Sequence, residues 1–167
     1  RPSISPSMDI QVSSNFERVL FDAYGRDGAA VRVLMAELAG GGFQISQGAL
    51  QMLRATFFSG RCSEDETTAT IRMIHETTGE ILCPHSAVGV KVAHGYFGPV
   101  PMITLATAHP AKFPDAVQAA MGTRPALPPR MADLFARHER VTRQPNDLKS
   151  LQSLVRARAN LSERTHR

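Results

Sequence analysis

The sequence predicts an α/β fold in which this chain supplies mainly helices and one or two strands of a larger sheet. Two observations lead to that prediction. Most of the 167 residues fall into amphipathic segments that begin at Ser, Asn or Asp and end at Gly. One run, VPMITLATA at 100–108, is rich in apolar and β-branched residues, as buried strands are. Because a single strand cannot make a sheet, we expect its partners outside this segment or in a weak neighbour such as residues 56–61.

Six or seven helices and one strand are expected along the chain. Ser63 and Glu66 have the spacing of a capping box, and Pro84 suits a first helical position. Residues 56–63 read as either a short strand or an extended link. The expected helices cover 13–25, 28–39, 46–54, 63–79, 84–96, 111–122 and the segment that Asn146 caps. We divide the chain into residues 1–123, the main body, and residues 124–167, a basic Pro-rich link and carboxyl-terminal helix.

Composition favours a cytoplasmic globular protein. The chain is 43% hydrophobic and 20% charged, and its longest uncharged stretch, 92–111, holds three prolines, so no membrane span is expected. Residues 1–9 lack the apolar centre of a signal peptide. Cys62 and Cys83 form no CxxC pair and suggest reduced thiols. The chain opens without methionine, and we expect a piece of something longer.

The formal charge of +4 is concentrated near the carboxyl end. Residues 124–167 hold ten Lys/Arg against four Asp/Glu, a net of +6. Such a tail would suit a nucleic-acid arm. It has only Phe135 as an aromatic residue and no lysine cluster, so a solvated or domain-covering tail is the favoured interpretation, with no nucleic-acid partner.

The end of the expected strand carries side chains that suit a ligand site. Thr107 and His109 flank Ala108, so on an extended backbone they share one face. Open α/β sheets bind ligands at the carboxyl ends of their strands. Spacing alone favours a simpler interpretation, in which the Thr107 hydroxyl caps the helix that follows Pro110.

A second candidate is Cys83-Pro84-His85-Ser86, at the start of the helix expected over 84–96. The free N–H groups there favour an anion, with His85 and Ser86 as contacts. Cys83 next to His85 would also suit a thiolate nucleophile, although a small buried side chain is the better interpretation. No HExxH or paired-histidine spacing is present, so we expect no metal.

Three stretches carry a family resemblance. SPSMDIQVSSNFER, SGRCSEDETTATIRMIHETTGEILCPHSAVG and TLATAHPAKFPDAV occur in this order and cover most of residues 5–122. The chain resembles the threonine synthase family, which has the tryptophan synthase β-subunit-like fold and uses pyridoxal phosphate. TAHPAKF is the most distinctive string. The resemblance implies conversion of O-phospho-L-homoserine and water to L-threonine and phosphate, by γ-elimination and β-addition.

The resemblance also implies roles for individual residues. Thr107 would face the cofactor's pyridine nitrogen through a neutral hydroxyl. Substrate contacts are expected from His85, Ser86, His109, Lys112, Asn15 and Arg18, with Lys112 attracting the substrate phosphate.

One departure from the family pattern limits what this chain does alone. Its only lysines are Lys91, Lys112 and Lys149, and none lies in the family's Ser-Phe-Lys-Asp type motif that carries the Schiff-base lysine. The glycine-rich phosphate loop is also missing. We therefore expect the carboxyl-terminal portion of the enzyme, inactive alone, with the amino-terminal part as its partner. The alternatives are a related pyridoxal-phosphate enzyme such as threonine dehydratase, or a non-catalytic interaction domain of the same fold.

Overall fold

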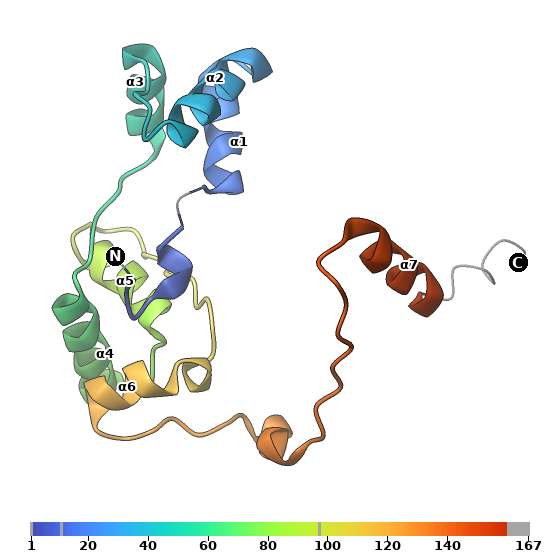
Figure 1. The fold of residues 1–167 in the computed structure, drawn as a ribbon. Coiled ribbons are helices and arrows are strands. Elements are labelled where there is room, and N and C mark those ends of the chain that lie inside the picture. The colour runs from blue at the N-terminus through green and yellow to red at the C-terminus, as the bar shows by residue number, and fades with distance from the viewer. Residues whose placement is uncertain (1, 11, 97, 160–167) are drawn as a thin grey trace, which may run out of the picture. The chain divides into compact units, whose positions relative to one another are not determined.

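The computed structural model describes residues 2–10, 12–96 and 98–159, and within these ranges the regular structure is entirely helical (Figure 1). The chain divides into two units, Arg1–Leu127 and Pro128–Arg167. The elements are η1 (Pro6–Met8), α1 (Ser14–Ala23), α2 (Gly28–Ala39), α3 (Gln47–Thr56), α4 (Glu64–Thr78), α5 (Pro84–His94), η2 (Pro110–Lys112), α6 (Pro114–Met121), η3 (Pro129–Met131), η4 (Leu134–Ala136) and α7 (Leu148–Arg158).

Helices α1, α2 and α3 form one group around an apolar cluster. Each begins at a side-chain cap, as the sequence predicts: Ser13, Asp27 and Ser46 accept hydrogen bonds from the backbone N–H groups of the first turns. The cluster that joins the helices consists of Leu20, Leu34 and Leu53. Burial of these leucines stabilises three helices that are each too short to persist alone.

Helix α4 has the capping box expected from the sequence. The Ser63 hydroxyl accepts from the Glu66 N–H (3.2 Å), and the Ser63 N–H donates to the Glu66 carboxylate (2.8 Å). The helix ends at Gly79, whose φ of 78° lies in the left-handed region that glycine adopts without strain. Both ends of α4 are therefore fixed by local chemistry.

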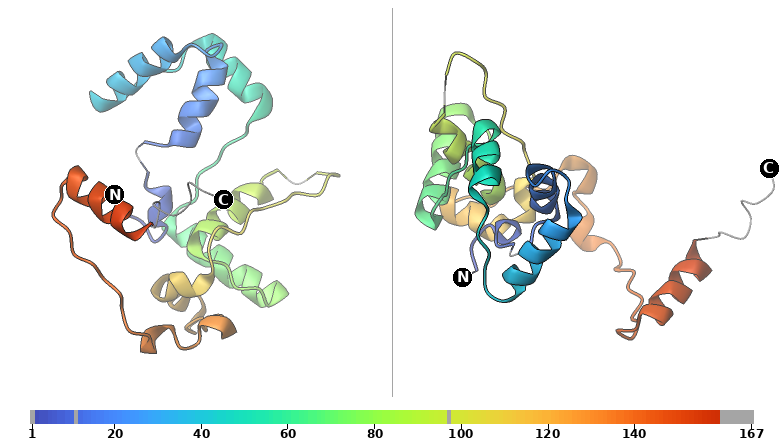
Figure 2. Two further views of the ribbon diagram at one scale, coloured as in Figure 1. Left: turned by 90° about the vertical axis from the view of Figure 1, so that its right-hand side faces the viewer. Right: turned by 90° about the horizontal axis from the view of Figure 1, so that it is seen from above.

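Helices α4, α5 and α6 pack together as a second group (Figure 2). Ile71, Ala87 and Ala120 are buried between them, one from each helix. The Arg72 guanidinium also donates to the Ala120 carbonyl oxygen (2.9 Å). This group positions the start of α5, where several candidate residues lie.

The predicted strand at 100–108 does not form in this structure. The segment is irregular, and Ile103 and Leu105 are 83% and 76% exposed. A strand is defined by hydrogen bonds to a neighbour, and among the described residues no segment forms strand pairing with this one. The apolar, β-branched composition was real, but within the described residues nothing pairs with it.

The segment before α4 is the extended link, not the strand, of the two forms that the sequence allowed. Residues 57–63 have no regular structure. Tyr96 anchors the link, because its hydroxyl donates to the Ser59 carbonyl oxygen (3.1 Å) and its ring lies 5.2 Å from that of Phe58.

In the second unit, α7 begins one residue later than expected. Asp147, not Asn146, is the cap, and its carboxylate accepts from the Ser150 N–H (2.8 Å). An ionised carboxylate accepts more strongly than an amide oxygen, and it also interacts favourably with the helix dipole.

None of the described helices is long and apolar enough to span a membrane.

Candidate functional site

The start of α5 is built around the Cys83 side chain. Cys83 is the N-cap residue, 1% exposed, and its sulfur accepts from the Ser86 N–H (3.4 Å). Pro84 occupies the first helical turn, where a missing N–H costs nothing. Cys83 is thus the small buried residue that the sequence favoured, and in this structure it also caps a helix.

Thr107 is tied to this helix start by three polar contacts. Its N–H donates to the Ser86 hydroxyl oxygen (3.1 Å), and its own hydroxyl lies 3.4 Å from that oxygen. The Thr107 hydroxyl also lies 3.8 Å from the Cys83 sulfur. Thr107 therefore meets Cys83 and Ser86, which precede it in the sequence by 24 and 21 positions.

The capping role that spacing suggested for Thr107 is wrong. His109 caps the next turn instead, since its Nδ1 accepts from the Ala111 N–H (3.2 Å). This leaves the Thr107 hydroxyl with side-chain neighbours only. These neighbours are the Ser86 hydroxyl in α5 and the sulfur of Cys83, the N-cap of that helix.

His85 contacts Ser7, whereas Ser86 contacts Thr107. Its Nε2 accepts from the Ser7 N–H (2.9 Å), which requires an unprotonated Nε2 and places the proton of a neutral ring on Nδ1. Its ring lies 4.5 Å from that of Phe113. His85 is 6% exposed, and its Nδ1 is buried with no hydrogen-bond partner among the described residues.

Burial and a nearby lysine favour the neutral form of His85. Burial lowers the pKa of His85, and repulsion from Lys112 lowers it further, while Asp9 opposes both. The Lys112 ammonium lies 5.8 Å from the centre of the Phe113 ring, on the same side chain that His85 contacts. Lys112 therefore places a positive charge that acts on the buried imidazole.

The thiol of Cys83 is perturbed in two opposing ways. Burial raises its pKa, but hydrogen bonds from Ser86 and Thr107 favour the thiolate and leave the pKa below its usual value. The sulfur is enclosed by the helix start, so it acts as a hydrogen-bonding group rather than as an accessible nucleophile.

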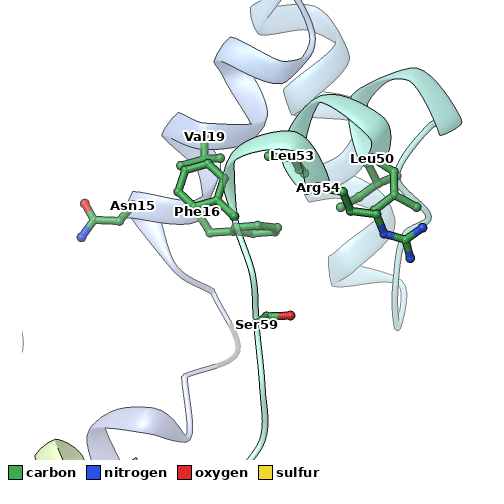
Figure 3. Close-up of a pocket in the computed structure, with 9 residues that line it drawn as sticks. Asn15, Phe16, Val19, Leu50, Leu53, Arg54 and Ser59 are labelled. Atoms are coloured by element: carbon green, nitrogen blue, oxygen red, sulfur yellow. The ribbon is translucent and has the colours of Figure 1, made fainter. Parts of the chain in front are cut away.

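Asn15 and Arg18 lie on α1, which packs with α2 and α3 in the other helix group. Asn15 borders an open hollow of about 530 Å³ whose wall is mostly apolar, with Phe16, Val19 and Leu53 among its lining. Figure 3 shows Asn15 on the opposite side of this hollow from Leu50 and Arg54, with its side chain pointing away from them. The six predicted substrate residues thus fall into two separate places.

Two contacts of the site had no signal in the sequence. Ser7 and His85 are 78 residues apart, and neither spacing nor motif indicated that a backbone N–H would meet the ring. Phe113 lies within the TAHPAKF string, but its ring contact with His85 is a product of tertiary packing. Among the described residues no cluster of His, Cys, Asp and Glu is suited to a metal ion.

The donor set at Thr107 suits a neutral aromatic nitrogen. A hydroxyl donates one proton to an unprotonated ring nitrogen at little electrostatic cost, whereas a carboxylate would hold that nitrogen protonated. Thr107, Ser86 and the protonated form of Cys83 supply only neutral groups. These residues therefore fit the pyridine ring that the family resemblance implies.

Comparisons with known proteins identify relatives of this chain. The family model "Threonine synthase, C-terminal" matches residues 86–155. Threonine synthase from Pseudomonas aeruginosa is 47% identical over 95% of this chain and 35% of its own length; that from Corynebacterium glutamicum is 39% identical over 95% and 34%. A crystal structure of PLP-bound threonine synthase from Brucella melitensis is 53% identical, with a TM-score of 0.82, over 94% of this chain and 34% of that one.

The chain spans about one third of the length of these relatives. Its similarity extends over nearly all of its own residues, including the start of α5 and the TAHPAKF string. This chain therefore belongs to the threonine synthase family, in which it resembles the carboxyl-terminal portion.

Proposed function

We propose that this chain is the carboxyl-terminal portion of a cytoplasmic, pyridoxal-phosphate-dependent threonine synthase. The reaction is the conversion of O-phospho-L-homoserine and water into L-threonine and phosphate. The observation that carries the proposal is the Thr107 hydroxyl, held by α5 among neutral groups. The likeness to a PLP-bound threonine synthase supports the same conclusion.

The cofactor, when bound, supplies an electron sink for carbanions formed on the substrate. The contribution of this chain is to hold one wall of that site. Thr107 would donate a hydrogen bond to the ring nitrogen, and a neutral hydroxyl at that position would leave the nitrogen unprotonated. His85, through its buried ring, holds residues 3–9 against the start of α5.

Positive charge in this wall favours a phosphorylated substrate. The ammonium of Lys112 lies on Phe113, beside His85, and no acidic side chain pairs with it among the described contacts. We propose that Lys112, with His109, attracts the substrate phosphate, while Asn15 and Arg18 contribute from α1 when the substrate is bound.

The rest of the enzyme supplies what this chain lacks. Of its three lysines, Lys91 pairs with Glu66 (3.3 Å) and none occupies a Schiff-base motif. Residues 1–123 would complete the catalytic domain together with an amino-terminal part, and residues 124–167 would form the link and the last helix. The exposed apolar segment at 100–106 supports such a partner, since exposed patches of this kind mark contact surfaces.

The proposal is tested on the full-length gene product purified with pyridoxal phosphate. We expect one phosphate released for each threonine formed from O-phosphohomoserine. Thr107→Ala should lower kcat/KM about tenfold, because the hydrogen bond from the neutral hydroxyl is lost. Thr107→Ser keeps the hydroxyl and should keep kcat/KM close to that of the wild type.

Other outcomes point to the alternatives. Turnover that needs no phosphate ester indicates a related enzyme such as threonine dehydratase. A full-length protein with no cofactor absorbance is a non-catalytic domain of the same fold. Threonine formation by the isolated 167-residue chain would contradict the expected inactivity.

A further inference from the structure

Cys83, Ser86 and Thr107 form a closed triangle of polar side chains. The Cys83 sulfur lies 3.2 Å from the Ser86 hydroxyl, which lies 3.4 Å from the Thr107 hydroxyl, which lies 3.8 Å from the Cys83 sulfur. Cys83 and Ser86 are 1% and 3% exposed, whereas Thr107 belongs to the exposed class. The triangle therefore has two buried corners and one open corner.

The hydrogen bonds within the triangle have an order. The Ser86 oxygen accepts from the Thr107 N–H (3.1 Å). The Ser86 hydroxyl can itself donate either to the Cys83 sulfur or to the Thr107 hydroxyl oxygen. A hydroxyl donates only one proton. If Thr107 donates outward, its oxygen is free to accept inward, from Ser86. With the thiol in its protonated form, the Cys83 S–H then donates to Ser86, and all three protons point toward the open corner.

We infer that Ser86 and Cys83 are positioning residues that aim the Thr107 proton at the cofactor's ring nitrogen. This inference rests on the proposed function. It also gives Ser86 a role other than the substrate contact that the sequence suggested: its hydroxyl is buried and engaged twice by Thr107, so it acts through Thr107.

The Ser86 hydroxyl matters because backbone pairing does not set a side-chain rotamer. Residues 98–108 have no regular structure here, and a strand formed with other parts of the enzyme would still leave the Thr107 side chain free to rotate about its Cα–Cβ bond. The Ser86 hydroxyl instead binds both the N–H and the side chain of Thr107. Removing it frees the hydroxyl to rotate among staggered positions, of which only one points at the ring nitrogen.

The test uses the full-length protein loaded with pyridoxal phosphate labelled with ¹⁵N in the ring. Three readouts are taken: the ¹⁵N chemical shift of the ring nitrogen, the absorbance band of the bound cofactor, and its Kd. The variants are Thr107→Ala, Ser86→Ala, Cys83→Ala and Cys83→Ser. Cys62→Ala is the matched control, because the Cys62 sulfur likewise contacts a hydroxyl, that of Thr67 (3.2 Å), but at the start of α4.

We expect Ser86→Ala to move the ¹⁵N shift in the same direction as Thr107→Ala and to raise Kd roughly fivefold, the effect of losing one hydrogen bond. Cys83→Ala should give a smaller change in that direction. Cys83→Ser retains a donor and an acceptor and should restore the wild-type shift, and Cys62→Ala should leave it unchanged.

The outcomes separate this inference from the proposed function. A ring nitrogen that responds to Thr107→Ala but not to Ser86→Ala or Cys83→Ala overturns the positioning role alone. A ring nitrogen that ignores Thr107→Ala, or a wild type that binds no cofactor, overturns both. Equal responses to Cys83→Ala and Cys62→Ala would show a general effect of thiol loss and would also overturn the inference.

Discussion

Replacing Ile103 by alanine measures whether the segment after α5 is covered in the full-length protein. The side chain is 83% exposed within the described residues. At such a surface position the truncation should change the free energy of unfolding by less than about 0.5 kcal/mol. If the amino-terminal part covers it, the loss is that of a buried isoleucine, about 2–5 kcal/mol. We predict the larger loss, because the proposed enzyme needs this segment as part of its sheet.

The assay is urea unfolding of the full-length protein and of two variants. Ile71→Ala is the reference, since Ile71 is fully buried within this chain and should lose about 2–5 kcal/mol in any case. A loss for Ile103→Ala of similar size confirms the covering partner. If Ile71→Ala is destabilised while Ile103→Ala stays within about 0.5 kcal/mol of wild type, the reasoning is refuted.

Two further predictions concern the same region. Burial and a nearby lysine depress the pKa of His85, so the bond from the Ser7 N–H is fully present above the ordinary histidine pKa of about 6.5 and is lost as the pH falls through the lower folded-state pKa. Hydrogen exchange at Ser7, corrected for its intrinsic rate, should rise on acidification, and constant protection would contradict this. Gly89→Ala should weaken cofactor binding, because the added carbon would lie 3.1 Å from a methyl carbon of Thr104. Gly48→Ala, with open space around it, should instead stabilise α3 by roughly 0.5–1 kcal/mol and leave the cofactor Kd unchanged. If Gly89→Ala also leaves the cofactor Kd unchanged, the close approach of Gly89 to Thr104 does not matter for binding.

Helix ends were predictable from sequence because their causes are local. Ser13, Asp27, Ser46 and Ser63 each accept from a backbone N–H two or three residues away, so the residue type and its position contain the information. The error at α7 has the same scale: Asn146 and Asp147 are adjacent candidates, and only geometry selects between them.

The strand and the site depend on contacts that the sequence does not encode locally. A strand at 100–108 was predicted from composition, but strands are made by their neighbours, and no described segment provides one. Likewise, spacing predicted that Thr107 caps a helix, whereas packing brings its hydroxyl to Ser86 of α5, which is 21 residues away in the sequence. The family resemblance, not the spacing, indicated a role for the Thr107 hydroxyl in a ligand site.

A crystal structure of the full-length protein with pyridoxal phosphate would test the central claim most directly. The account predicts the Thr107 hydroxyl at hydrogen-bond distance from the ring nitrogen, about 2.7–3.2 Å, with the Ser86 hydroxyl still behind it. A ring nitrogen that meets a carboxylate, or that lies beyond about 4 Å from Thr107, would contradict it.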